Sequence, residues 1–192
     1  MEKTVIRKRL LTARNNLDGN EYLQRSHQAQ RLLIAADVFS RAGSLALYSP
    51  IRNEVATHEL FRTARDAGKK VCFPKVVGEQ LSFAPVKSLA ELSSGAFGVA
   101  EPAGEGAVGR EELDLIVVPG VAFDARGHRL GYGRGFYDRF LSGRTAGLAV
   151  VGLFFDFQLC PDLPEEGHDQ RLDFVVTETR FIPCHIGVTG SS

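Results

Sequence analysis

"LDLIVVPGVAFDARGHRLGYGRGFYDRF", at residues 113–140, is the stretch that decides the fold of this 192-residue chain. It opens with an apolar run, which is typical of a strand buried on both faces of a parallel sheet. The run ends at Pro119-Gly120, a glycine-rich segment follows, and residues 135–143 have the pattern of a short helix. Buried strands that alternate with helices build α/β proteins, so the stretch predicts an α/β fold.

The same alternation extends to both sides of this stretch. Further strands are predicted at 44–49, 70–76, 80–86, 147–155 and 172–179. Helices are predicted at 3–17, 19–39 and 57–68. Together these segments predict a single α/β domain over residues 1–192. It has three layers, with a mostly parallel central sheet flanked by helices and an N-terminal pair of helices.

Local signals set the limits of the helices. Asp18 is the expected N-cap of the second helix, and Glu21 three residues later completes a capping-box pattern. Thr57 is the expected cap of the third helix and Gly68 its stop. Residues 93–110 are rich in glycine and alanine with little pattern, so we expect a surface loop there.

The composition excludes several classes of protein. The 23 basic and 23 acidic residues balance, so no strong field favours nucleic acid or a membrane surface. The longest apolar run, at 146–155, is too short to span a bilayer, and MEKTVIRKRL lacks the apolar core of a signal peptide. Three cysteines without CxxC spacing indicate buried free thiols, and hence a cytoplasmic protein. They are Cys72, Cys160 and Cys184.

The glycine-rich segment lies where open parallel sheets bind ligands, beyond the carboxyl end of a strand. Gly131, Gly133 and Gly135 can turn their N–H groups toward a bulky anion. Arg134 offers a guanidinium for phosphate, and Asp138 offers a carboxylate for Mg²⁺. The segment matches neither the dinucleotide fingerprint nor the P-loop. On the residues alone, a glycine-rich turn with Asp138 capping the next helix remains the alternative.

The segment PGVAFDARGHRLGYGRGFYDRFL resembles the signature of the 5-formyltetrahydrofolate cyclo-ligase family. The family pattern is roughly P-G-x-x-F-D-x-x-G-x-R-L-G-x-G-x-G-[FY]-Y-D-R, and every fixed position is matched. KTVIR near the N-terminus, YSPIRNEVAT and HDQRLDFVVTE fit three further family segments, so almost the whole chain is covered. Many relatives carry lysine at the position of Arg134, which leaves the role of this arginine open.

The resemblance implies an ATP-driven, Mg²⁺-dependent ring closure of 5-formyltetrahydrofolate to 5,10-methenyltetrahydrofolate. The formyl oxygen takes the γ-phosphoryl group, N10 attacks the activated carbon, and phosphate leaves. Because phosphoryl transfer is mostly positioning and charge neutralisation, the reaction requires no protein nucleophile. The expected partners are ATP and 5-formyltetrahydrofolate, with neither nucleic acid nor membrane, and a monomer or weak homo-oligomer is expected.

The resemblance also implies the site residues. ATP is expected at Lys3, Arg7, Leu130, Gly131, Tyr132, Gly133, Arg134, Gly135, Phe136, Tyr137 and Asp138. The folate is expected at Ser49, Glu54, Gly133, Arg134, Gly135, Phe136 and Tyr137. Arg134 and Tyr137 are expected to be catalytic, and Asp138 and Asp169 to bind the metal.

For some of these residues there is a physical reason for the expected role, and for others an alternative interpretation. A carboxylate such as Glu54 can accept two hydrogen bonds from the donor edge of a pterin. Lys3, Arg7 and Arg14 form a basic stripe beside the apolar face of the first helix, where cations usually extend to solvent. Phe136 and Tyr137 can line the folate pocket or only pack the short helix. Asp173 competes with Asp169 for the metal, and His168 is expected to be structural or solvated.

Two other functions compete with the cyclo-ligase. One is a sugar-phosphate isomerase or CoA-transferase-like enzyme, because related α/β folds support such activities without ATP. The other is a non-catalytic folate- or nucleotide-binding protein, against which the intact set of expected site residues argues.

Overall fold

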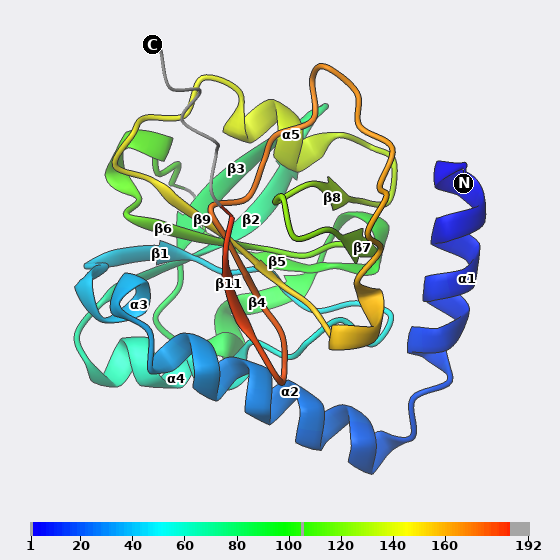
Figure 1. Cartoon of the computed structure of the whole chain (residues 1–192). Coiled ribbons are helices and arrows are strands. Elements are labelled where there is room, and N and C mark those ends of the chain that lie inside the picture. The colour runs from blue at the N-terminus through cyan, green and yellow to red at the C-terminus, as the bar shows by residue number, and fades with distance from the viewer. Residues whose placement is uncertain (1, 105, 185–192) are drawn as a thin grey trace, which may run out of the picture.

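A seven-stranded sheet forms the centre of the computed structural model, which describes residues 2–104 and 106–184. Its strands lie in the order β11-β10-β9-β6-β1-β2-β3 (Figure 1). The five strands from β10 to β2 pair in parallel, whereas β11 and β3 pair antiparallel at the two edges. The bounds are β1 Ser44–Ala46, β2 Lys70–Val77, β3 Gln80–Pro85, β6 Leu115–Val118, β9 Ala149–Leu153, β10 Phe174–Val176 and β11 Phe181–Pro183. The predicted mostly parallel sheet is confirmed.

Helices and two small sheets surround this centre. The α-helices are α1 Lys3–Asn15, α2 Gly19–Ile34, α3 Asp37–Arg41, α4 His58–Asp66 and α5 Phe136–Leu141. The 3-10 helices are η1 Leu89–Glu91, η2 Ala96–Gly98, η3 Arg110–Glu112 and η4 Asp156–Gln158. The small sheets are two antiparallel pairs, β4 Leu92–Ser94 with β5 Ala100–Pro102, and β7 Ala122–Phe123 with β8 Arg129–Leu130.

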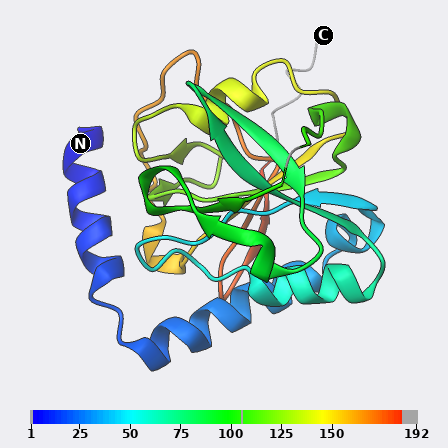
Figure 2. The same ribbon diagram turned by 180° about the vertical axis from the view of Figure 1, so that it is seen from behind.

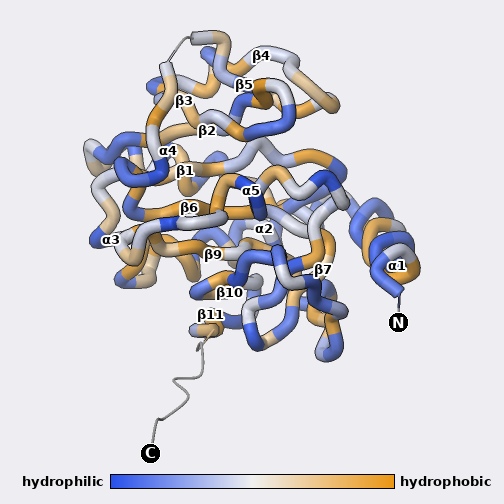
Figure 3. Tube along the Cα trace, turned by 90° about the horizontal axis from the view of Figure 1, so that it is seen from above, coloured by the Kyte–Doolittle hydropathy of each residue, from blue (hydrophilic) through white to orange (hydrophobic). Residues whose placement is uncertain are grey.

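β6 shows why its apolar run decides the fold. All four of its side chains are buried, and they alternate between the two faces of the sheet. Leu115 and Val117 pack in the cluster that includes α2, α3 and α4, whereas Ile116 and Val118 pack in the cluster that includes α5. Figure 1 shows the corresponding layers, with α2 to α4 below the sheet and α5 above it. In Figure 3, β6 and β9 are coloured as hydrophobic.

The helix α1 stands beside the sheet (Figures 1 and 2). Its apolar residues Ile6 and Leu10 pack in a third buried cluster, with Val121 and Leu130 from the β7–β8 hairpin. The hairpin leads directly into the glycine-rich segment. The packing of α1 therefore holds the basic stripe of the helix next to that segment.

The second predicted helix is interrupted. Residues 19–39 form α2 and α3 with a turn at Ala35 and Ala36, where Ala36 is extended. Leu33 and Phe39 are both buried in the same cluster. Six residues apart on one helix, they would point about 120° away from each other, so the turn allows both to reach the core.

The capping of two helices differs from the prediction. Asp18 caps α2 through its side chain, as expected, but Glu21 pairs with Arg25 instead of returning to the cap. The Thr57 hydroxyl donates to the carbonyl of Tyr48 at 2.9 Å and does not cap α4. The first N–H groups of α4 donate to the side chain of Gln30 in α2 instead. A cap supplied from a distant helix leaves no local sequence signal.

The segment 93–110 is more regular than the predicted surface loop. Most of the β4–β5 hairpin lies in it, and Glu101 accepts hydrogen bonds from the N–H groups of Val76 and Ala96. Elsewhere the three cysteines are free and buried, as predicted. Among residues 2–104 and 106–184, no helix has the length and apolar character needed to cross a membrane.

We predict that Gly152 in β9 tolerates no side chain. A Cβ atom there would overlap the Phe154 ring and Leu172 Cδ1, and both of these side chains are buried. Overpacking of this kind costs about 1–3 kcal/mol, so Gly152→Ala should lower the free energy of unfolding by that amount in urea titrations. Gly147→Ala, where a Cβ has nothing within 4 Å, is the control and should change it by less than about 0.5 kcal/mol.

Candidate active site

A cavity of about 930 Å³ lies between α1, the β4–β5 hairpin and the glycine-rich segment. Its volume is that of a small-molecule binding site. It is lined by every site residue predicted from the sequence: Lys3, Arg7, Ser49, Glu54, the nine residues 130–138, and Asp169. Residues far apart in the chain therefore converge on one place, although their roles remain predictions.

The glycine-rich segment, residues 131–135, runs from β8 to the start of α5. Gly133 and Gly135 have left-handed backbones, with φ of 97° and 65°, and Gly135 is the N-cap residue of α5. A Cβ on Gly133 would lie 3.6 Å from the Arg7 guanidinium, an ordinary van der Waals contact, so the left-handed backbone and not a lack of space favours glycine here. The Leu130 side chain, in contrast, turns into the buried cluster with Ile6.

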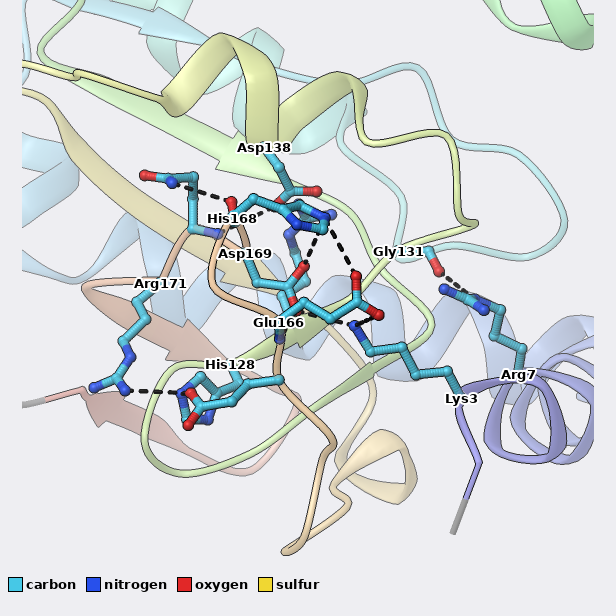
Figure 4. Close-up of polar contacts among 12 residues, drawn as sticks. Lys3, Arg7, His128, Gly131, Asp138, Glu166, His168, Asp169 and Arg171 are labelled. Atoms are coloured by element: carbon cyan, nitrogen blue, oxygen red, sulfur yellow. Dashed lines mark hydrogen bonds and ion pairs between the residues drawn. The ribbon is translucent and has the colours of Figure 1, made fainter.

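The cations of α1 already hold partners at the rim of the cavity (Figure 4). Arg7 Nε donates to the carbonyl of Gly131 at 2.9 Å. Lys3 Nζ lies 3.0 Å from Asp169 Oδ2 and 3.0 Å from Glu166 Oε1. Partial burial opposes the charge on Lys3, but the hydrogen bonds with the two carboxylates overcome it and raise the pKa of Lys3. Lys3 and Arg7 are four residues apart, so their side chains share one face of α1.

Glu54 is a buried carboxylate, only 3% exposed. Its Oε2 accepts from the N–H of Ile51 at 3.0 Å, and its Oε1 accepts from the hydroxyl of Tyr132 at 2.9 Å. Burial raises the pKa of Glu54 to about 7, although the nearby charge of Arg14 and these hydrogen bonds act in the opposite direction. Glu54 follows a turn in which Arg52 and Asn53 have left-handed backbones, a conformation that is uncommon outside glycine.

The acidic residues near α5 have distinct environments. Asp138 accepts hydrogen bonds from Arg129 at 2.9 Å and from the N–H of Gln170 at 3.3 Å. No side chain caps α5, so the alternative role of Asp138 as a helix cap is wrong. Asp173 forms a two-fold pair with Arg144, at 2.7 Å for both contacts, and is not among the residues that line the cavity. Because Asp173 lies outside the cavity and is paired with Arg144, the structure favours Asp169 over Asp173 as a metal ligand.

Asp169 belongs to a group of three residues that offer ligand atoms to a metal. Oxygen or nitrogen atoms of Glu166, His168 and Asp169 lie within 4.8 Å of one another (Figure 4). Partial burial opposes ionisation of Asp169, but the N–H of Glu166 and the ammonium of Lys3 outweigh it and lower the pKa of Asp169. The carboxylates of this group suit Mg²⁺, which prefers oxygen ligands. The His168 side chain is mostly exposed, as expected.

Ser49 and Arg134 both contact the β4–β5 hairpin. Ser49 Oγ donates to the carbonyl of Ala100 at 2.6 Å. The guanidinium carbon of Arg134 lies 3.8 Å from the centre of the Phe97 ring, a cation–π contact. Arg134 is exposed, and the Phe97 ring supports its side chain although glycines flank it on both sides.

Two residues that line the cavity, Phe97 and Arg129, were not predicted from the sequence. Phe97 is an exposed aromatic residue within a glycine-rich stretch, and that contrast was an available signal. Arg129 is buried, pairs with Asp138 and lies 5.7 Å from the centre of the Tyr137 ring. It occupies a fixed position of the family pattern, which would have identified it.

Comparisons with known proteins agree with this geometry. Residues 1–178 match the family model described as the 5-formyltetrahydrofolate cyclo-ligase family. The probable 5-formyltetrahydrofolate cyclo-ligase of Schizosaccharomyces pombe is 33% identical, over 75% of this chain and 79% of that protein. The 5-formyltetrahydrofolate cyclo-ligase of Mus musculus is 30% identical, over 84% and 86%. The NMR structure of Aquifex aeolicus 5,10-methenyltetrahydrofolate synthetase has a TM-score of 0.87 at 38% identity, covering 100% of this chain and 97% of that one.

A parallel sheet that ends in a glycine-rich segment, with cations and a buried carboxylate around one cavity, defines an α/β enzyme site for a phosphate-bearing ligand. The chain belongs to the 5-formyltetrahydrofolate cyclo-ligase family, as the motifs indicated. As a member of that family it is an ATP-dependent ligase that acts on folate.

The burial of Glu54 predicts a pH-dependent loss of stability. Because its pKa is about 7 in the folded protein and near 4.5 when unfolded, it favours folding below pH 4.5 and this contribution is lost as pH rises through 7. The difference in unfolding free energy between Glu54→Gln and wild type should move in favour of the variant by about 2–3 kcal/mol from pH 5 to pH 8. Urea titrations at both pH values measure it, and a difference that does not change with pH would contradict the assignment.

Proposed function

We propose that the residues around this cavity carry out the family reaction, the ATP-driven conversion of 5-formyltetrahydrofolate to 5,10-methenyltetrahydrofolate. The observation that carries the assignment is the convergence of Lys3, Arg7, the glycine-rich segment and Glu54 on one cavity. Phosphate ligands need cations and free N–H groups, and a pterin needs a carboxylate. The cavity offers both.

The proposed chemistry begins with transfer of the γ-phosphoryl group. The bond between the γ-phosphorus and the ADP oxygen breaks, and a bond to the formyl oxygen forms. N10 of the folate then attacks the formyl carbon and loses its proton, and phosphate leaves with the electrons of the carbon–oxygen bond. The products are 5,10-methenyltetrahydrofolate, ADP and phosphate. Positioning and neutralisation of the phosphates are the main tasks of the protein.

In this proposal the phosphates lie between α1 and the glycine-rich segment. Lys3 and Arg7 neutralise them from α1, and the backbone of Gly131 to Gly135 holds them closely. Arg134 stabilises the charge that spreads over the transferred group. Tyr137 lies at the start of α5, where burial raises its pKa, so its hydroxyl stays protonated and available as a donor.

The folate occupies the side of the cavity formed by Glu54. The carboxylate accepts hydrogen bonds from the N–H and amino edge of the pterin, which gives the ring its orientation. Ser49 and Phe136 line the same cavity, and the hydroxyl of Ser49 is already bonded to the hairpin. Its contribution is therefore to position the hairpin beside the substrate.

The carboxylates of Asp138 and Asp169 fit a Mg²⁺ ion in charge and ligand type, and both line the cavity. We assign the metal to these two residues, and Glu166 is a neighbour of Asp169 in the same group. When bound, the ion supplies positive charge to the ATP phosphates. The free, buried cysteines support a cytoplasmic location, and we propose that the chain acts as a single domain, as a monomer or weak homo-oligomer.

A single assay tests the reaction. Protein, 5-formyltetrahydrofolate, ATP and Mg²⁺ should yield the near-ultraviolet band of the methenyl product, with one ADP formed for each product molecule. Omission of ATP, or addition of EDTA, should abolish both signals. Ring closure at full rate without nucleotide would exclude the proposal and favour an isomerase-like enzyme. Binding without turnover would indicate a non-catalytic protein.

The metal assignment has its own test. Asp169→Asn should raise the Mg²⁺ concentration required for half-maximal rate.

Arg134 provides a second test. Arg134→Ala should lower kcat/KM about thirty- to a thousandfold, because loss of one preorganised donor costs about 2–4 kcal/mol of transition-state stabilisation. Arg134→Lys should keep most of the activity, since lysine retains the charge. Both variants should melt near the wild-type temperature, because the residue is exposed. Equal turnover by the alanine variant would reduce Arg134 to a solvated surface charge.

A further inference from the structure

Arg14, in the last turn of α1, is a buried arginine, 1% exposed. Its guanidinium contacts three separate segments. Nε donates to the carbonyl of Arg52 at 2.8 Å, Nη1 donates to the carbonyl of Gly120 at 3.0 Å, and Nη2 donates to the hydroxyl of Tyr132. Burial of a charge is costly unless it is well hydrogen-bonded. The deep burial of this guanidinium therefore indicates a role beyond the packing of α1.

Tyr132 passes this contact on to Glu54. Its hydroxyl accepts from Arg14 and donates to Glu54 Oε1 at 2.9 Å. Two guanidiniums lie near its ring, with Arg14 Cζ 5.7 Å and Arg52 Cζ 5.6 Å from the ring centre. The hydroxyl is thus fixed from both ends, and the carboxylate oxygen that it contacts is held in one orientation.

The charge of Glu54 depends on this arrangement. Burial raises the pKa of Glu54, and the factors that oppose burial are the charge of Arg14, the N–H of Ile51, the Tyr132 hydroxyl and the charge of Arg52. Without them the pKa of Glu54 would rise further above its usual range, and a smaller fraction of the carboxyl groups would be ionised at neutral pH. A protonated carboxyl group cannot accept two hydrogen bonds from a pterin edge as a carboxylate does.

We propose that Arg14 and Tyr132 are positioning residues for folate recognition, in which Arg14 acts through the Tyr132 hydroxyl to keep Glu54 ionised and oriented toward the substrate. Neither residue needs to touch the reacting atoms. The proposal rests on the role of Glu54 as the pterin-binding residue in the proposed function.

Glu54 is the group that titrates near neutral pH in this set. The charged and titratable groups that face it are Arg14 from α1, Tyr22 from α2, Tyr48 and Arg52 from the segment after β1, Tyr132 from the glycine-rich segment, and Tyr137 from α5. Burial raises the pKa of each of the four tyrosines, so they remain neutral. The guanidiniums remain charged throughout this range.

The test is the pH dependence of folate binding, measured by calorimetry with 5-formyltetrahydrofolate and no ATP, from pH 6 to pH 9. Wild-type affinity should fall by up to tenfold per pH unit below about pH 7, as Glu54 is protonated. Tyr132→Phe removes one hydroxyl and should bind about ten- to a hundredfold more weakly at pH 7. Its affinity should return to within about threefold of wild type at pH 9, because the higher pH restores the carboxylate.

Matched variants separate this role from a structural one. Arg14→Lys keeps the charge but loses the fork, so its pH midpoint should lie between those of wild type and Tyr132→Phe. Arg9→Lys, an exposed arginine on the same helix, should leave the midpoint unchanged. Tyr132→Phe removes only the hydroxyl that contacts Arg14 and Glu54 and keeps the backbone that holds the phosphates in the proposed function. ADP affinity should therefore stay within about twofold, whereas a displaced glycine-rich segment would lower it. If Arg14→Lys fails to fold, Tyr132→Phe decides the question.

The outcomes are distinguishable. If Tyr132→Phe loses the same folate affinity at every pH, or loses none at pH 7, the positioning role is overturned. The pterin-binding role of Glu54 would be unaffected by that result. Glu54→Gln should bind weakly with no dependence on pH. Wild-type affinity in Glu54→Gln would reject the pterin assignment itself, and the positioning role with it.

Discussion

The site depends on the burial of the apolar face of α1 against the β7–β8 hairpin. Ile6 and Leu10 are almost fully buried there, each worth about 1.5–3 kcal/mol relative to exposure. Helical spacing then places Lys3 and Arg7 at the rim and Arg14 inside. The apolar contacts with the β7–β8 hairpin therefore both hold α1 beside the sheet and orient its cationic side chains. Loss of this packing would separate the phosphate-binding side chains from the glycine-rich segment.

The five parallel strands of the central sheet were predictable from the sequence because their apolar runs act locally, whereas the short pairs β4–β5 and β7–β8 and the edge strand β11 were not predicted. The run at 113–120 specifies β6 whatever its neighbours are, and its alternating burial needs only a layer on each face. The sequence could indicate residues that line the cavity because family segments of fixed spacing contain them. Helix boundaries were less predictable, since the cap of α4 comes from Gln30 in another helix.

Arg14 shows why the remainder of the site could not be predicted. Spacing placed it in a basic stripe, where cations usually extend to solvent. Its acceptors are 38, 106 and 118 residues away in the chain, and nothing near position 14 announces them. The same holds for the contact between Arg134 and Phe97, which joins two glycine-rich segments of different elements. Periodicity describes one element at a time, whereas these contacts exist only after several elements have packed.

The pairing of Lys3 with Asp169 and Glu166 is consistent with a site that exchanges partners when ligands bind. Glu166 is 55% exposed, and ion pairs that involve exposed groups contribute about 0–1 kcal/mol. In the proposed function Lys3 turns to the ATP phosphates and Asp169 to Mg²⁺, so each charge replaces one partner of opposite sign with another. Little stability is lost with the Lys3–Glu166 pair, whereas the Lys3–Asp169 pair, with side chains only 19% and 17% exposed, must be replaced by ligand contacts of comparable strength. Glu54 is the contrasting case, since the carboxyl group and the guanidinium of Arg14 are both buried and, in the proposed function, the carboxylate must form before the substrate arrives.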